Sequence, residues 1–243
     1  MAAAENRLPN GIVRNFLGRF GADFAPEWPD HRMTEQASVT TFVMGARLPW
    51  PDESPGADFA GPFDDGIIHN SGFRQHCSIR KISALGATLR CNVQNATGEE
   101  LTIELPSGQR TSAIVEWSDR GETGMRFAKP IDVLALINRK LVSQPIDRRS
   151  MPRVEIRCGA YIKRGEEFVA ATIRNISARG FQLEGDALPP PGTYVSLFVA
   201  GLSIPPGEIA WRKGKLAGIE LFEELGWSSI LPWIREILRN QAH

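Results

Sequence analysis

Basic residues are concentrated in one stretch of the chain, from Arg148 to Gly180. This stretch contains eight arginines and lysines against three glutamates, a net charge of +5, whereas the 243-residue chain has a formal net charge of zero. A local positive field inside a neutral protein favours one specific anionic ligand over general adhesion to nucleic acid or membrane. We therefore expect the chemistry of this protein to lie within this stretch.

Two groups of polar residues in this stretch suit a nucleotide. Arg149 and Arg153 are four residues apart on a proline-containing, non-helical segment, so both can reach over a single ligand. A guanidinium group is planar and always charged, binds phosphate oxygens in pairs and recognises the O6/N7 edge of guanine. Asn175 and Ser177 are two residues apart, so on a strand they face the same side, and Gly180 permits a positive φ or a close backbone approach. The set contains no nucleophile paired with a base, which indicates binding rather than catalysis.

The order and spacing of these two groups resemble the two-part signature of the PilZ domain. The first part is Arg149-x-x-x-Arg153, and the second, about twenty residues later, is Asn175-x-Ser177-x-x-Gly180. The resemblance covers the chain from Pro145 to its carboxyl end. It implies a small antiparallel β-barrel that binds the bacterial second messenger cyclic di-GMP, with the first motif on a flexible loop that folds over the nucleotide.

The resemblance also implies the residues that contact the ligand. Arg148 extends the first motif to a double arginine, a variant that in the family often accompanies a stacked pair of ligand molecules. We expect cyclic di-GMP as the ligand, with no catalytic residue, no metal and no other cofactor. The implied ligand-binding residues are Arg148, Arg149, Arg153, Asn175, Ser177 and Gly180.

An internal repeat with an offset of 94 residues determines the expected architecture. The segment Cys77–Leu89 matches Ala171–Leu183 with seven of thirteen positions identical. The same offset relates Trp117 to Trp211 and Gly124 to Gly218. One offset that holds over separated blocks indicates a duplicated domain with equal loop lengths.

The expected fold is therefore mainly β, with two small antiparallel PilZ-type β-barrels, each followed by a carboxyl-terminal α-helix. Asp132 is predicted to cap a helix over Val133–Leu141, and Ser228 or Ser229 to cap a second helix with Pro232 in its first turn. Trp117 and Trp211 are expected to pack in the core. The strands predicted for the second copy are Val154–Lys163, Phe168–Ile173, Phe181–Glu184, Tyr194–Val199, Gly207–Trp211 and Leu216–Leu221.

Composition divides the chain into three parts. Residues 1–68 are rich in proline, glycine and alanine and hold ten acids against five arginines, which predicts a largely disordered segment that supplies a strand near 38–48. The second part, 69–142, is expected to be a degenerate PilZ-like barrel with its helix. The third part, 143–243, is expected to be the PilZ barrel with the carboxyl-terminal helix.

The first copy departs from the family pattern where the ligand contacts would lie. Lys81 stands at the position of Asn175, and no Arg-x-x-x-Arg occurs anywhere before Lys81. Ser83 and Gly86 remain, but a strand turn alone accounts for both residue types. We expect this copy to keep the barrel and to have lost the nucleotide.

Composition also limits the classes of function that this protein can have. The sequence indicates a reduced cytoplasmic protein without a transmembrane segment. It has three scattered cysteines, four histidines without metal-ligand spacing, no apolar run of eighteen residues and no secretion signal. An aromatic content of 8% and a pI of about 6.9 disfavour nucleic-acid binding. The expected function is a cyclic di-GMP receptor and adaptor, in which binding at Arg148–Arg153 rearranges the domains for a protein partner. The alternative is a PilZ-fold protein–protein interaction module that binds no nucleotide.

Overall fold

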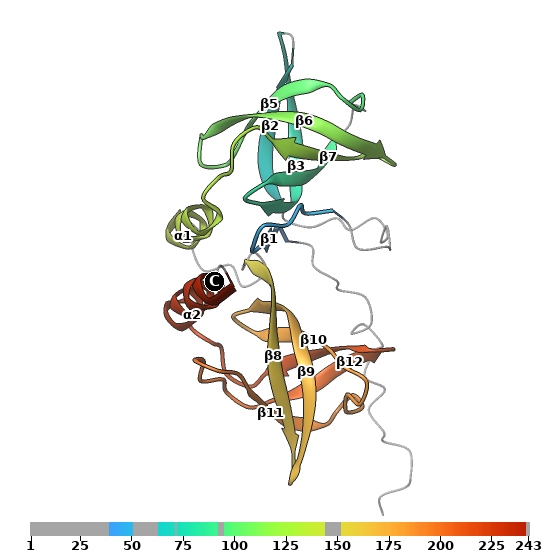
Figure 1. Cartoon of the computed structure of the whole chain (residues 1–243), viewed down its shortest axis with the longest axis vertical. Helices are drawn as coiled ribbons and strands as arrows, with labels where there is room; N and C mark the ends of the chain where they lie inside the picture. The colour runs from blue at the N-terminus through green and yellow to red at the C-terminus, as the bar shows by residue number, and fades with distance from the viewer. Residues whose placement is uncertain (1–38, 51–62, 71, 92–94, 144–151, 242–243) are drawn as a thin grey trace, which may run out of the picture. The chain divides into compact units, whose positions relative to one another are not determined.

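The computed structural model describes residues 39–50, 63–70, 72–91, 95–143 and 152–241. These residues form thirteen strands and two helices (Figure 1). The mainly β fold with two helices is therefore confirmed. Most of the segment predicted to be disordered, namely 1–38 and 51–62, lies outside the described residues.

Strands β8 to β13 form a closed antiparallel barrel. They pair in the order β8–β9–β10–β13–β12–β11, and β11 pairs again with β8. Alternate residues point inward, and Ile162, Ile173 and Leu183 are fully buried in the barrel core. All six strands predicted for this part are present, but β9 continues to Ser177. The strands are β8 (Arg153–Arg164), β9 (Glu167–Ser177), β10 (Gly180–Glu184), β11 (Tyr194–Phe198), β12 (Gly207–Lys213) and β13 (Leu216–Leu221).

Strands β2 to β7 pair among themselves in the order β3–β2–β5–β6–β7–β4, and β4 pairs again with β3. Their inward residues include Ile79, Leu89 and Met125, which are buried. β2 begins at Asp64, within the part that composition assigned to the low-order segment. The strands are β2 (Asp64–Asn70), β3 (Phe73–Ser83), β4 (Gly86–Cys91), β5 (Glu100–Glu104), β6 (Arg110–Asp119) and β7 (Glu122–Phe127).

A short strand, β1 (Thr41–Val43), lies between β3 and β8 and is parallel to both. It falls within the range 38–48 in which a strand was predicted. The side chain of Phe42 is 2% exposed and belongs to the hydrophobic core. β1 thereby gives both β3 and β8 a hydrogen-bonded neighbour at an edge that would otherwise be unpaired.

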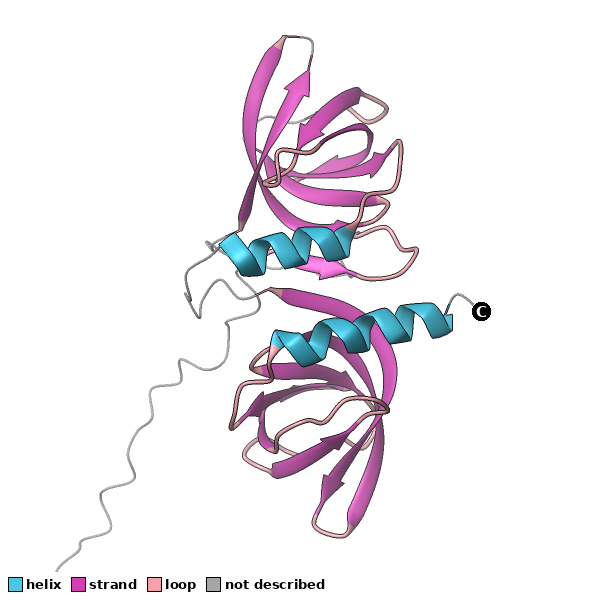
Figure 2. Cartoon of the chain, turned by 90° about the vertical axis from the view of Figure 1, so that its left-hand side faces the viewer, coloured by secondary structure: helices cyan, strands magenta, loops and turns pink. Residues whose placement is uncertain are grey.

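Each set of strands is followed by a helix (Figure 2). The first, α1 (Val133–Ser143), begins as predicted, because an oxygen of Asp132 accepts a hydrogen bond of 3.0 Å from the amide of Ala135. On the same helix, the Lys140 ammonium is buried and lies 2.5 Å from a carboxylate oxygen of Asp64. This ion pair fastens α1 to the beginning of β2.

The second helix, α2 (Trp227–Gln241), begins earlier than predicted. The amides of Ser229 and Ile230 both donate to the carbonyl of Gly226, so the expected serine caps lie inside the first turn. The prediction of a serine cap is therefore wrong, and Pro232 lies beyond the first turn. The helix packs on the barrel through Trp233, whose indole nitrogen donates to the Ala200 carbonyl at 3.0 Å.

The β9–β10 turn brings the barrel backbone unusually close to itself at Gly180. A Cβ atom at this position would lie 2.1 Å from the carbonyl oxygen of Ile219 on β13. The φ angle of Gly180 is not positive, so the requirement for glycine comes from this close approach.

We expect Gly180→Ala to destabilise the protein by about 1–3 kcal/mol, because the new methyl group must displace a strand backbone. This corresponds to a fall of about 2–12 °C in Tm, measured by thermal unfolding followed by circular dichroism. Gly159→Ala is the matched control, because a Cβ there would meet no atom within 4 Å. Equal Tm values for the two variants would contradict the prediction.

Candidate functional site

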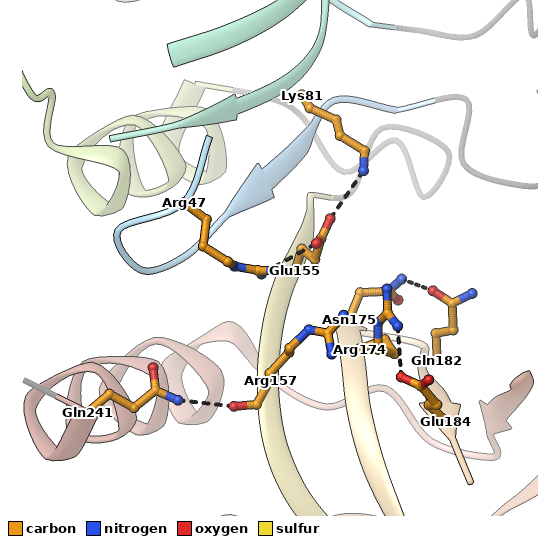
Figure 3. A network of polar contacts seen from close by, with 9 residues as sticks. All are labelled: Arg47, Lys81, Glu155, Arg157, Arg174, Asn175, Gln182, Glu184 and Gln241. Carbon is orange, nitrogen blue, oxygen red and sulfur yellow. Dashed lines mark hydrogen bonds and ion pairs between the residues drawn. The ribbon is translucent and has the colours of Figure 1, made fainter. Parts of the chain in front are cut away.

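A row of outward-facing residues crosses five adjacent strands of the closed barrel. Glu155 lies opposite Asn175, Asn175 opposite Gln182, Gln182 opposite Gly218, and Gly218 opposite Trp211. We call these five residues the carboxyl-terminal row. It contains Asn175 from the second motif, and Figure 3 shows Glu155, Asn175 and Gln182 side by side on their strands.

Two side-chain amides occupy the middle of the row. The Asn175 amide nitrogen donates to the side-chain oxygen of Gln182 at 2.5 Å, and both side chains are half-buried. This contact orients both amides, which together carry donors and acceptors of the kind found on base edges. Sequence reasoning identified Asn175 but missed Gln182.

A β-bulge places a charged residue beside these amides. The register of β9 shifts near Arg174 and Asn175, and both residues are half-buried rather than alternating between the core and the surface. The Arg174 guanidinium donates to the Glu184 carboxylate at 2.7 Å. This hydrogen bond, together with the positive charges of Arg174, Arg157 and Lys215, lowers the pKa of the Glu184 carboxyl. Glu184 therefore stays ionised to a lower pH than an isolated glutamate.

Trp211 closes the row with a flat aromatic surface. A Cβ on Gly218 would lie 2.1 Å from the indole nitrogen of Trp211, so the ring covers this glycine on the outer face. Trp211 is half-buried and does not belong to the core cluster. The expectation that Trp211 packs in the core is therefore wrong. The absence of a side chain on Gly218 is what lets the indole lie against the strand.

The first motif is described only in part. Arg148 and Arg149 lie outside the described residues, whereas Arg153 is the first residue of β8. Arg153 is half-buried, pairs in register with Thr41 of β1, and faces outward two residues before Glu155. It thus lies at the glutamate end of the carboxyl-terminal row.

The remaining motif residues, Ser177 and Gly180, build the turn between β9 and β10. The Ser177 hydroxyl donates a long hydrogen bond of 3.4 Å to the Gly180 carbonyl. In the first copy, the Ser83 hydroxyl makes the same contact with the Gly86 carbonyl at 3.5 Å. The hydroxyl contact in the turn and the close approach of each glycine to a neighbouring strand therefore account for these two residue types in both copies.

Glu155 connects the row to the preceding part of the chain. Its carboxylate is 12% exposed and lies 3.3 Å from the Lys81 ammonium and 3.3 Å from the Arg47 guanidinium (Figure 3). The backbone carbonyl of Glu155 also accepts a hydrogen bond from the amide of Met44 at 2.9 Å. Sequence reasoning missed these contacts because Arg47 and Lys81 are far from both motifs and carry no spacing signal.

The arrangement is suited to holding a polar, planar ligand with negative charge. It offers guanidinium groups, two oriented amides and one aromatic face along a single surface. Among the described residues, no group of histidine, cysteine, aspartate and glutamate is placed to hold a metal ion. Neither of the two described helices is long and apolar enough to cross a membrane.

Comparisons with known proteins find similarity to solved structures only. No family model matches the sequence, and no curated protein matches it. The PlzA protein of Borreliella burgdorferi in complex with c-di-GMP has 14% identity and a TM-score of 0.29, over 71% of this chain and 86% of that one. The inhibitor of motility MotI/DgrA of Bacillus subtilis has 14% identity and a TM-score of 0.27, over 74% and 98%. The MrkH–c-di-GMP complex of K. pneumonia has 13% identity and a TM-score of 0.25, over 74% and 87%. These TM-scores are too low to support a conclusion about this chain.

Proposed function

We propose that this protein is a cytoplasmic cyclic di-GMP receptor of the PilZ type, and that it acts as an adaptor rather than an enzyme. The nucleotide binds over the carboxyl-terminal row, with Arg148, Arg149 and Arg153 closing over it. The observation that carries this proposal is the position of Asn175 on the outer face of the barrel. Asn175 lies opposite Glu155 of β8, and this strand begins two residues earlier, at Arg153. Arg153 from the first half of the sequence motif and Asn175 from the second thus lie on neighbouring strands.

The chemistry of the row supports a purine-containing ligand. The Asn175 and Gln182 amides are held together at 2.5 Å and can hydrogen-bond the edge of a base. Arginine guanidinium groups bind phosphate oxygens in pairs and stack on purines. The indole of Trp211 adds a second flat surface at the other end of the row.

The proposal includes a second, degenerate barrel formed by β2 to β7. The same offset of 94 residues relates its bulges to those of the closed barrel, between Ile79 and Lys81 and between Val115 and Trp117. Lys81 replaces the amide of Asn175, so this copy lacks the second motif as well as the first. One nucleotide site, or one stacked pair of nucleotides, is expected per chain.

Signal output is proposed to pass through the contacts of Glu155. Binding at Arg153 orders the segment before β8 and changes how β8 lies against β1 and Lys81. A ligand can shift such an equilibrium only to the extent that it binds one arrangement more tightly. The rearranged surface is then read by a protein partner.

One observation favours the alternative of a protein–protein interaction module without nucleotide. Two pairs of exposed aromatic rings lie on the closed barrel, Phe168 with Phe198 at 5.8 Å and Tyr194 with Phe222 at 5.5 Å between ring centroids. Exposed aromatic groups of this kind are common in protein interfaces. The same surface would serve the adaptor as its partner-binding face, so nucleotide binding is the property that separates the two functions.

We expect the purified protein to bind cyclic di-GMP saturably in calorimetric titration, and Arg149→Ala/Arg153→Ala to bind at least roughly 100-fold more weakly. Each charge-assisted hydrogen bond contributes about 1.5–3 kcal/mol, and about 1.4 kcal/mol corresponds to a tenfold change in Kd. The measured stoichiometry distinguishes a single nucleotide from a stacked pair.

Two controls accompany this titration. Arg164→Ala/Arg239→Ala removes two exposed arginines away from the row and should bind like the unaltered protein. Cyclic di-AMP, which lacks the guanine O6 acceptor, should produce no comparable heat. Absence of binding by the folded, unaltered protein would reject the receptor function and leave the interaction module.

A second variant tests the amide in the row. Asn175→Ala removes one neutral hydrogen-bonding group worth about 0.5–1.5 kcal/mol, so Kd for cyclic di-GMP should rise roughly 3- to 10-fold. Asn240→Ala, at the exposed end of α2, removes the same group elsewhere and should leave Kd unchanged. If Asn175→Ala binds as tightly as Asn240→Ala, the nucleotide does not lie over the row.

Limited proteolysis tests the proposed rearrangement. We expect cleavage within residues 144–151 to slow when cyclic di-GMP is added, because the bound arginines order this segment. Cyclic di-AMP, and cyclic di-GMP added to Arg149→Ala/Arg153→Ala, should leave the rate unchanged. An unaltered rate with a saturating ligand would rule out this mechanism while leaving binding itself intact.

A further inference from the structure

The first copy carries a row that matches four of the five residues of the carboxyl-terminal row, all but Glu155. Its residues follow one another across β3, β4, β7 and β6, and the offset from their counterparts is 94 throughout. As in the closed barrel, a tryptophan lies on a glycine: a Cβ on Gly124 would be 2.0 Å from the indole nitrogen of Trp117. We call this set the amino-terminal row: Lys81, Thr88, Gly124 and Trp117.

A segment of the same chain, Leu48–Trp50, lies on the amino-terminal row. The Thr88 hydroxyl donates to the carbonyl of Pro49 at 2.5 Å. The ring of Trp50 meets that of Trp117 edge to face, with centroids 6.1 Å apart and planes at 79°.

The amino-terminal end of this segment also contacts neighbouring residues. A methyl group of Leu48 lies 3.3 Å from where a Cβ of Gly86 would be, beside the turn that begins β4. At both Gly86 and the equivalent Gly180 the nearest atom is a carbonyl oxygen of the neighbouring strand, but only at Gly86 does a side chain, that of Leu48, lie among the three nearest atoms. Before the segment, Arg47 forms an ion pair with Glu155 at 3.3 Å. Pro49 and Trp50 therefore contact the row itself, and Leu48 contacts the turn beside it.

The contacts have the character of peptide recognition. Pro49 is buried, and as a proline it has a fixed φ and needs no partner for a backbone amide hydrogen. Its carbonyl accepts a hydrogen bond from the hydroxyl of Thr88, a residue that is only 2% exposed. The neighbouring Trp50 meets the ring of Trp117 edge to face, and that ring lies on the bare surface of Gly124. A short apolar–proline–aromatic peptide is thus bound through one hydrogen bond and one ring contact.

We propose that the amino-terminal row is a peptide-binding site and that its ligand is the chain's own Leu48-Pro49-Trp50. The site takes an extended peptide of the class apolar–proline–aromatic, and its occupant closes it to any other ligand. This proposal rests on the contacts of the first copy and is independent of nucleotide binding. The expectation that Trp117 packs in the core is wrong, because the residue is half-buried and lies outside the core cluster. The proposal explains why it has a ring partner from a distant part of the chain.

The test must remove the tethered occupant, because a segment of the same chain has a high effective concentration at its site. The probe is a fluorescein-labelled peptide with the sequence of residues 44–54, and the opened variant is full-length Leu48→Ala/Trp50→Ala. Fluorescence anisotropy should show saturable binding of the peptide to the opened variant and at least tenfold weaker binding to the unaltered protein. Adding Trp117→Ala to the opened variant should weaken binding at least tenfold.

Each contrary result has a defined meaning. Absence of peptide binding by an opened variant with an unaltered circular dichroism spectrum would overturn the proposal, and so would equal binding after Trp117→Ala. A peptide with alanine at the Leu48 and Trp50 positions should not bind. A molar mass of twice the monomer for the unaltered protein, measured by light scattering, would assign the occupant to a second copy and overturn the intramolecular assignment.

A second measurement covers the case in which the opened variant fails to fold. The unaltered chain is labelled with 5-fluorotryptophan, and the Trp50 resonance is assigned by its loss in Trp50→Phe. Thr88→Val should shift this resonance, because it removes the hydrogen bond to Pro49. Thr172→Val, the same change on the outer face of β9, should not. An unchanged Trp50 resonance in the Thr88→Val variant would contradict the proposal.

Discussion

The structure depends on the pairing of one three-residue strand with two neighbours. Thr41–Val43 runs parallel to both β3 and β8, and the amide of Met44 extends the pairing to the carbonyl of Glu155. Backbone groups in a protein interior must be paired, so β1 satisfies two strand edges at once. Phe42 sets the register, because its side chain is buried and a slip of one residue would turn it outward. This register places Lys81 and Arg153 on either side of Thr41.

The same pairing determines the electrostatics around Glu155. A carboxylate that is only 12% exposed requires compensating charge, and Arg47 and Lys81 supply it at 3.3 Å each. Both cations lie before β8 in the chain, whereas Glu155 shares its strand with Arg153. A ligand that reorients Arg153 therefore acts on the strand that holds this ion-pair cluster. The coupling proposed for the receptor thus needs no contact beyond those already present.

Local patterns in the sequence predicted much of the fold. The six strands of the closed barrel follow from alternating apolar residues between turn signals, and the offset of 94 recurs because matching bulges and tryptophan–glycine contacts need the same spacing. The start of α1 was predictable because Asp132 caps it through its own side chain. The start of α2 was not, since the residue before it, Gly226, has no side chain that could cap the helix and mark its beginning.

The candidate site was predictable only where it consists of motif residues. Asn175 was identified by its spacing from Ser177, but Gln182 joins it only through strand pairing, which leaves no signal in the sequence. The outward position of Trp211 depends on the bare surface of Gly218, and an aromatic residue at a strand end gives no indication of which face it occupies. The docking of Leu48–Trp50 joins Pro49 to Thr88, 39 positions away, and Trp50 to Trp117, 67 positions away, so neither periodicity nor spacing reveals it.

The two proposed sites differ by few side chains on matching strands. In the carboxyl-terminal row, Asn175 and Gln182 bond to each other and present an amide surface. In the amino-terminal row, Lys81 cannot accept a hydrogen bond, and its ammonium is engaged by Glu155 instead. The hydroxyl of Thr88 is then left to donate to a peptide carbonyl, and its shorter side chain leaves room for Pro49. The tryptophan on its glycine is common to both rows, so the difference between the two proposed ligands rests on the residues at the positions of Asn175 and Gln182.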